Sequence, residues 1–220
     1  MKKSFSLVEL SIAMIVIGFI IGAVMSGRDL IKSGETKEFY QTFARKWTTI
    51  IDTYYDRMNV HLTDSTSNSG KNDYANGYFD GIDMSNDSNQ TSLKNQLITA
   101  GINPCKLIST NCYFEDGSCN PTCYKISGEF TDEATVQLYL NSYIYNSIPT
   151  NFIVLHNIPS DIAVAVDKLI DGKANGEYGN AIAFATLGNY SDDQNISTLS
   201  PINYSDYVGQ LINLGIEVEN

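Results

Sequence analysis

The cysteines are the residues of this chain best suited to covalent or metal chemistry. Cys105, Cys112, Cys119 and Cys123 lie within 19 residues of one another. Zinc sites usually contain Cys pairs separated by two to four residues, and only Cys119 and Cys123 have such a spacing, with neither histidine nearby. We therefore interpret the cluster as disulfides of an exported protein, with zinc as the alternative.

A single carboxylate lies near the start of a long apolar run. Phe5–Met25 contains 21 residues and only one charge, Glu9, and it follows the basic residues Lys2 and Lys3. A helix of this length spans the hydrocarbon core of a bilayer. Insertion of a carboxylate costs about 2.5–3.5 kcal/mol at mid-bilayer and less near the interface. The presence of Glu9 in this run therefore indicates a functional role for its side chain. The run could also be a signal anchor, or a signal peptide removed near residues 26–27.

The residues Lys2-Lys3-Ser4-Phe5-Ser6-Leu7-Val8-Glu9-Leu10 resemble the leader of type IV pilins and type II secretion pseudopilins. The resemblance covers about the first tenth of the chain. It implies that a prepilin peptidase cleaves between Ser4 and Phe5 and that Phe5 is then N-methylated. The family usually has Gly before the cleavage point, where this chain has the small residue Ser4.

The same resemblance implies a role for Glu9 in assembly. After cleavage, the α-amine of Phe5 carries a positive charge that enters a bundle of packed helices, and a buried charge needs a partner. In the family a carboxylate at this position neutralises the terminal amine of a neighbouring subunit, a role that maps onto Glu9 and Phe5. Gly18 and Gly22 form Gly-x-x-x-Gly, which allows close helix packing in lipid, although glycine is also common in membrane helices.

A second stretch, Ile162–Gly179, resembles a region that precedes a strand near the C-terminus of many pilins and pseudopilins. Its Asp167-Lys168-Leu169-Ile170-Asp171-Gly172 matches the Ile-Asp-Lys-x-Ile-Asp-Asp-Gly pattern with one acid missing. Related secretion pseudopilins bind Ca²⁺ near this loop, so Asp171, Asn175 and Glu177 are candidate oxygen ligands. The alternative is a glycine-rich turn with solvated acids, and no other cofactor is expected.

The elements that position these residues begin with a long helix. Beyond the apolar run, apolar residues recur in steps of 4, 4, 3, 4 and 4, at Phe39, Phe43, Trp47, Ile50, Tyr54 and Met58. This spacing predicts one apolar stripe on a helix that continues to about Met58. We therefore expect a leader at 1–4, a membrane-spanning or filament-core helix at 5–27, its amphipathic continuation at 28–62 and a head at 63–220.

The predicted head is an antiparallel sheet with short helices, which makes the fold class α+β, with the pilin-like layout that the resemblance implies. Helices are expected at 92–100 and at 160–172, the second beginning with Ser160 as its cap and burying Ile162, Val166 and Leu169. A final segment, 204–218, should combine a short helix capped by Ser205 with a strand. Strands are expected at 106–109, 111–114, 124–130, 136–140, 143–148, 152–157 and 180–187. A hairpin tip at 115–118 favours a nested pairing, Cys112–Cys119 inside Cys105–Cys123, among three possible connectivities.

The composition excludes some functions. A net charge of −11 and a pI near 4.5 disfavour nucleic-acid binding. Two histidines, outside any recognisable motif, favour a protein that is not an enzyme.

The expected function is a structural subunit of a pilus or of a secretion or competence filament. Its expected partners are pilin-like subunits, prepilin peptidase, inner-membrane assembly machinery and, before assembly, membrane lipid. Its head would lie in the bacterial periplasm before assembly. The alternative is a secreted or membrane-anchored binding protein or adhesin that does not assemble.

Overall fold

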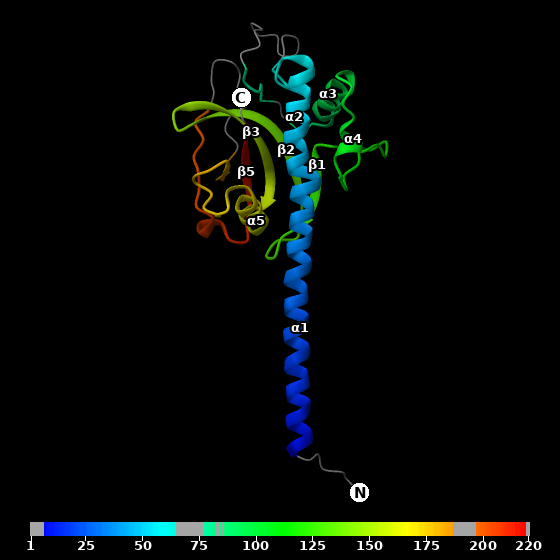
Figure 1. Ribbon diagram of the computed structural model, residues 1–220, viewed down its shortest axis with the longest axis vertical. Coiled ribbons are helices and arrows are strands. Elements are labelled where there is room, and N and C mark those ends of the chain that lie inside the picture. Colours follow the sequence, from blue (N-terminus) through cyan, green and yellow to red (C-terminus); the bar gives the residue numbers. More distant parts are fainter. Residues whose placement is uncertain (1–6, 65–76, 82–83, 85, 187–196, 219–220) are drawn as a thin grey trace. The chain divides into compact units, whose positions relative to one another are not determined.

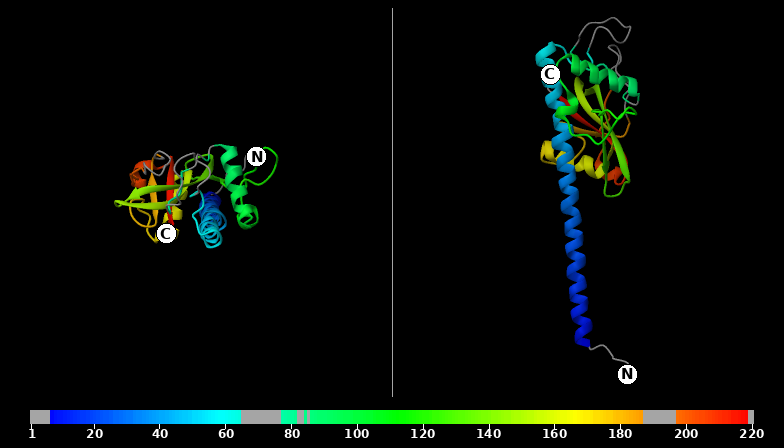
Figure 2. Two further views of the ribbon diagram at one scale, coloured as in Figure 1. Left: turned by 90° about the horizontal axis from the view of Figure 1, so that it is seen from above. Right: turned by 90° about the vertical axis from the view of Figure 1, so that its right-hand side faces the viewer.

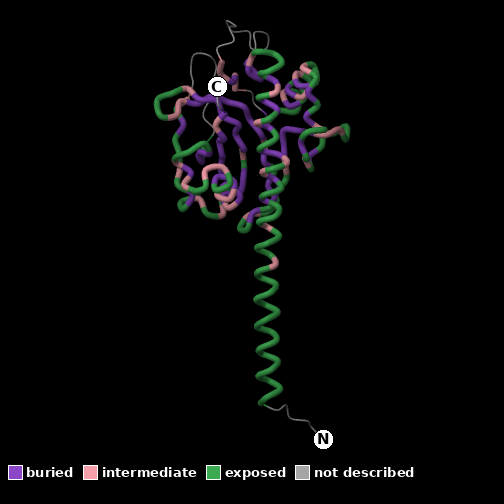
Figure 3. Tube along the Cα trace, viewed as in Figure 1, coloured by how far each residue is buried: buried purple, intermediate pink, exposed green. Residues whose placement is uncertain are grey.

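The computed structural model of the protein describes residues 7–64, 77–81, 84, 86–186 and 197–218. The chain forms two compact units, Met1–Glu38 and Phe39–Asn220. The second is called the head unit below. Helix α1 (Leu7–Phe39) makes up the described part of the first unit, and Figure 3 shows it exposed over nearly all its length. Its apolar side chains face outward all round, because the described residues of this unit form no second element against which one side could be buried.

The head unit begins with a wide helical turn, η1 (Tyr40–Ala44), followed by α2 (Arg45–Met58). The predicted stripe is confirmed from Phe39 to Tyr54, all of whose apolar members are buried, but Met58 is 45% exposed. A four-residue step overshoots one α-helical turn by about 40°, so Phe39, Phe43 and Trp47 would drift round a regular helix. The π-helical turn contains one more residue per hydrogen-bonded ring and keeps the three on one side.

The sheet has five antiparallel strands in the order β1-β2-β3-β5-β4 (Figure 1). Its strands are β1 (Cys123–Ser127), β2 (Glu133–Tyr145), β3 (Ile148–Pro159), β4 (Ala181–Phe184) and β5 (Leu211–Val218). Figures 1 and 2 show α2 lying along the sheet, with α3 on one side of it and β3 and β5 on the other. The rings of Phe39 and Phe43 pack on Tyr124 of β1, with centroids 5.1 and 5.5 Å away.

Part of the sheet curls into a ring. Tyr143 of β2 and Phe184 of β4 lie three strand positions apart, about 14 Å in a flat sheet, yet their ring centroids are 5.6 Å apart. Residues 197–202 close the gap, because Leu199 N–H donates to Ile144 of β2 and Ile202 N–H donates to Ala183 of β4. Strands β2, β3, β5 and β4 together with 197–202 are called the ring below, and its interior is filled by aromatic side chains.

The remaining elements are α3 (Asp87–Thr99), α4 (Pro104–Leu107), α5 (Ser160–Asp171) and η2 (Tyr204–Tyr207). The strand predicted at 106–109 is wrong, because Pro104 begins a helical turn there. The strand predicted at 111–114 is reduced to one bridge, between Tyr113 and Cys119. The strands predicted at 136–140 and 143–148 are one long strand, β2, which is followed by the two-residue turn Asn146-Ser147.

The helix caps also differ from the predictions. Ser160 does not cap α5, whose N-cap is Pro159 without a side-chain bond, and its hydroxyl instead accepts from Gly209 N–H. Asn203, not Ser205, caps η2 by accepting from the N–H of Ser205 at 3.0 Å. Leu169 is 40% exposed, so its predicted place on the buried face of α5 is wrong.

Trp47 joins α2 to the segment before β1, since its buried Nε1–H donates to the carbonyl of Pro121 at 3.0 Å. We expect Trp47→Phe to lower the free energy of unfolding by about 2–4 kcal/mol, since it combines lost ring volume with an unsatisfied buried carbonyl. Urea titration measures the change. Tyr55→Phe, at a 42% exposed position of the same helix, is the control and should change stability little. Equal effects of the two variants would contradict the assigned role of the Trp47 bond.

Candidate functional site

The candidate assembly residues lie at the start of α1. Ser4 and Phe5, the predicted cleavage and methylation positions, are outside the described residues. Glu9 is in the first turn of α1 and is exposed, between Leu7 and Leu10, which are 85% and 57% exposed. The Ser11 hydroxyl donates to the carbonyl of Leu7 at 2.6 Å, so this polar group is satisfied within the helix. A carboxylate is favourable in the first turn because it faces the positive end of the helix dipole.

The helix is long and apolar enough to cross a membrane, and its most apolar 18-residue window is 0% buried within the chain. Gly18 and Gly22 both lie in this stretch, one turn apart. A Cβ added at either glycine would meet nothing within 4 Å, so neither is used for packing inside the chain. The two glycines form a flat surface that remains open to lipid or to another helix.

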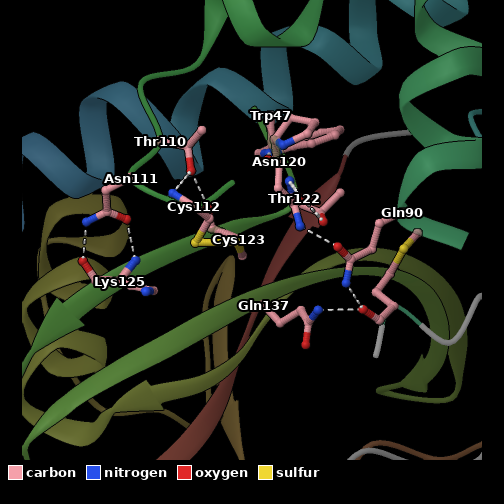
Figure 4. Close-up of a disulfide and its surroundings, with 12 residues drawn as sticks. Trp47, Gln90, Thr110, Asn111, Cys112, Asn120, Thr122, Cys123, Lys125 and Gln137 are labelled. Atoms are coloured by element: carbon pink, nitrogen blue, oxygen red, sulfur yellow. Dashed lines mark hydrogen bonds between the residues drawn. A yellow bond between two sulfur atoms is a disulfide. The ribbon is translucent and has the colours of Figure 1, made fainter. Parts of the chain in front are cut away.

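All four cysteines form disulfides, and their pairing corrects the nested prediction. The bonds are Cys105–Cys119 and Cys112–Cys123 (Figure 4 shows the second). The predicted tip at 115–118 is a tight turn, with Phe114 N–H donating to the carbonyl of Ser118. However, Tyr113 rather than Cys112 lies opposite Cys119. Since neighbouring residues of an extended chain point to opposite faces, Cys112 and Cys119 face away from each other.

The disulfide segment, residues 105–123, is held on several sides. The Nζ of Lys94 on α3 donates to the carbonyl of Cys119 at 2.9 Å and lies 5.0 Å from the ring centroid of Phe114. Asn120 Oδ1 accepts from both the N–H and the hydroxyl of Thr122, while its amide group donates to Gln90 Oε1 (Figure 4). In this buried group each donor faces an acceptor, so the hydrogen bonds fix the segment in one arrangement.

Two side chains of this segment bond to the outer side of β1. Asn111 donates from Nδ2 to the carbonyl of Lys125 at 2.8 Å and accepts from the Lys125 N–H at 2.6 Å (Figure 4). The Thr110 hydroxyl donates to the carbonyl of Cys123 at 2.6 Å. The amide of Asn111 therefore takes the place that a neighbouring strand would occupy beside Lys125.

The predicted Ca²⁺ ligands lie at the end of α5 and in the loop between α5 and β4, where backbone N–H groups bond to the side-chain oxygens of Asp171 and Asn175. Asp171 accepts from Asn180 and Ala181 through its two oxygens, and Asn175 Oδ1 accepts from Glu177 and Tyr178. A Cβ at Gly179, where φ is +116°, would lie 2.2 Å from Asp171 Oδ2. Within the described residues, no group of three acidic, His or Cys side chains is placed to hold a metal ion. The side chains of Asp171 and Asn175 therefore stabilise the loop by accepting hydrogen bonds from its backbone.

Asp167, on the buried face of α5, bonds to this loop and was not among the predicted ligands. Its side chain is 0% exposed, and Oδ2 accepts from the N–H groups of Asn175 and Gly176, each at 3.1 Å. Oδ1 and the nearby Tyr204 hydroxyl are buried with no bond of good geometry. Burial raises the pKa of Asp167 most strongly, and the nearby carboxylate of Asp171 raises it further. The N–H groups of Gly176 and Asn175 and the Tyr204 hydroxyl lower it by a smaller amount. Burial and the same carboxylates also raise the pKa of Tyr204.

The two histidines lie in separate parts of the head unit. His61 stacks on Tyr55 with ring centroids 4.6 Å apart, and burial lowers its pKa against the opposing effect of Asp64. His156 of β3 lies between Tyr139 and Asn213, with its Nδ1 2.6 Å from Asn213 Oδ1. Both are held by neighbours that offer packing rather than a nucleophile.

Comparison of the chain with models of protein families, with curated proteins and with solved structures found no match. The geometry described above and the resemblance of the first ten residues are therefore the grounds for a functional proposal.

The disulfide pairing can be tested with matched double variants. Cys112→Ser/Cys123→Ser should retain the Cys105–Cys119 bond, show no free thiol after unfolding, and lose about 2–4 kcal/mol of unfolding free energy. Cys112→Ser/Cys119→Ser splits both bonds and should expose two thiols and lose more stability. Thiol titration and urea titration measure both effects. Absence of free thiols in the second variant would support the nested pairing.

Asp167 should make stability depend on pH. Its pKa in the folded state is above the unfolded value of 3.8, so the neutral form is the one that suits the folded state. The stabilising contribution is complete below 3.8 and is lost as pH rises through the raised value. Asp167→Asn keeps an acceptor for the two loop N–H groups and has no charge. Relative to this variant, the unmodified chain should lose unfolding free energy as pH rises above the unfolded value of 3.8. Parallel stability curves over that range would contradict the assignment.

Proposed function

We propose that the protein is a structural subunit, a type IV pilin-like or pseudopilin-like protein, that assembles into a filament through α1 after cleavage before Phe5. The observation that supports this most is an apolar helix, uncovered by its own chain, with one carboxylate in its first turn. The role is non-catalytic, with α1 held in lipid before assembly and in a helix bundle afterward.

The apolar surface of α1 supports assembly on energetic grounds. Its Leu, Ile, Val, Met and Phe side chains are 49–85% exposed between Leu7 and Ile31. Each such side chain gains about 1.5–3 kcal/mol on leaving water, so α1 requires lipid or other helices around it. When α1 moves from lipid into a bundle of helices, its apolar side chains stay buried, so this step costs little free energy. The packing between helices then decides whether the subunits assemble. The open Gly18 and Gly22 surface suits such packing.

Glu9 supports a specific register between subunits. In a bundle of apolar helices, a lone carboxylate is costly unless a cation lies beside it. The α-amine of a processed Phe5 from a neighbouring subunit is such a cation, four residues from Glu9 along the chain. This pair would fix how far each helix is shifted along the next, which lipid contacts alone do not do.

The disulfides and the surface charge support an exported head. Both bonds of the disulfide segment are of the kind that persists in oxidising compartments, which supports a head in the periplasm or outside the cell. A net charge of −11 keeps such heads mutually repulsive and soluble while α1 provides the attraction. The partners are further pilin-like subunits, prepilin peptidase and the inner-membrane assembly machinery.

Mass spectrometry of the mature N-terminus in the native host tests processing. We expect a methylated Phe5. A start near Gly27 would show that a signal peptide has been removed and that the protein is secreted, and an intact Met1 would indicate a membrane anchor that is never processed. Either result contradicts the proposal.

The charge pair is tested by Glu9→Ala, which we expect to reduce filament yield at least about tenfold, because the amine of the neighbouring Phe5 would be buried without a partner. Glu35→Ala removes an exposed carboxylate from the same helix and should leave the yield unchanged. Filaments of normal yield from the Glu9→Ala variant would refute the pairing, even if Phe5 is methylated.

A further inference from the structure

A cavity opens at one end of the ring, beside the turn between β2 and β3. It has a volume of about 500 Å³ and is called the ring-mouth cavity here. Its lining comes from three separate segments of the chain. The first is the end of β2 with the turn that follows it, Ile144, Tyr145, Asn146 and Ser147. The others are the loop before β4, with Glu177 and Tyr178, and the closing segment, with Thr198, Leu199 and Pro201. The mouths of β-barrels are common ligand sites, and this volume is within the range of small-molecule sites.

The walls of this cavity are fixed by bonds between the segments. The Tyr145 hydroxyl donates to the carbonyl of Glu177 at 3.1 Å, which joins the turn to the loop before β4. The Leu199 N–H donates to the carbonyl of Ile144 at 3.0 Å, which joins the closing segment to β2. Because these bonds are made within the chain, binding would require little ordering of the site.

The lining combines aromatic surface with neutral polar groups. Tyr178, one of the lining residues, is 66% exposed, and Leu199 and Pro201 add apolar residues to the lining. The lining residues Asn146, Ser147 and Thr198 carry one amide and two hydroxyls, and Glu177 carries a carboxylate. Among the nine lining residues none carries a positive charge and Glu177 is acidic, so the charge of the lining disfavours a phosphate or a carboxylate.

We propose that the ring-mouth cavity binds a neutral sugar, with one pyranose ring against Tyr178 and its hydroxyls bonded to the amide, hydroxyl and carboxylate groups of the lining. A pyranose has an apolar face of C–H groups and a rim of hydroxyls that both donate and accept. The cavity offers an aromatic face and a mixed set of donors and acceptors, which is the complement of that pattern. This binding does not depend on filament assembly.

The conformation of Ser147 supports a ligand role for its side chain. Asn146 and Ser147 form a two-residue hairpin turn with φ values of 50° and 67°. Such turns favour Asn followed by Gly, since Gly has no Cβ to strain at positive φ. The chain has Ser at the second position, so it accepts backbone strain there and retains a residue with a hydroxyl in the cavity lining. Strain of this kind is concentrated at functional sites.

The test uses the full chain in zwitterionic micelles, because alkyl-glycoside detergents would compete for the cavity. Saturation-transfer NMR is recorded with the methyl pyranosides of glucose, galactose, mannose and N-acetylglucosamine, and with N-acetylneuraminic acid. We expect saturable binding of at least one neutral sugar, with Kd of about 0.5–10 mM, and at least tenfold weaker binding of the acidic sugar. Absence of saturable binding by all four neutral sugars would overturn the proposal, as would preference for the acidic one.

Three variants locate the site. Tyr178→Ala should weaken binding at least about tenfold, whereas Tyr113→Ala, at a tyrosine that is 67% exposed on the disulfide segment, should leave it unchanged. Ser147→Gly should weaken binding about 3–10-fold without lowering Tm, because it removes the hydroxyl and relieves the turn. Unchanged affinity in the Tyr178 variant, or equal losses in both tyrosine variants, would show that the sugar does not bind in this cavity.

Discussion

The apolar surface of α1 is the constraint on which the rest of the molecule depends. From Leu7 to Met25 the helix offers apolar side chains in every direction, and the chain covers none of its most apolar window. From Phe39 the apolar residues narrow to one stripe, and the head unit is built on that stripe. The helix thus changes from a surface that must be covered by other molecules to one that the sheet covers.

The helix could be predicted from the sequence because its signal is local. Steps of three and four residues from Phe39 to Tyr54 identify a buried stripe without knowledge of what lies opposite, and the antiparallel sheet follows from β-rich runs separated by turns. The π-helical turn that keeps Phe39, Phe43 and Trp47 together is absent from any such count. The only trace of this turn in the sequence is two successive four-residue steps. In a regular helix, residues with that spacing would not stay on one side.

The cysteines show where local reasoning ends. Their cluster predicts disulfides, but the partner of Cys112 depends on whether Tyr113 or Cys112 lies opposite Cys119, which is a shift of one residue. Asp167 left a weak signal, an acid four residues after Ala163 on the buried face of α5. The ring-mouth cavity left none, because it requires Ile144, Glu177 and Thr198 to meet from segments that are far apart in the sequence.

The bonds that Asn111 and Thr110 make to β1 have a consequence for the proposed filament, in which copies of the chain would lie side by side at high density. An uncovered strand edge is a template on which a second chain can add its own strand, which leads to aggregation. Here β1 is covered at Lys125 and Cys123, and β4 is covered by residues 197–202. Strand addition at these positions is therefore blocked, and the order of such a fibre would be left to its helices.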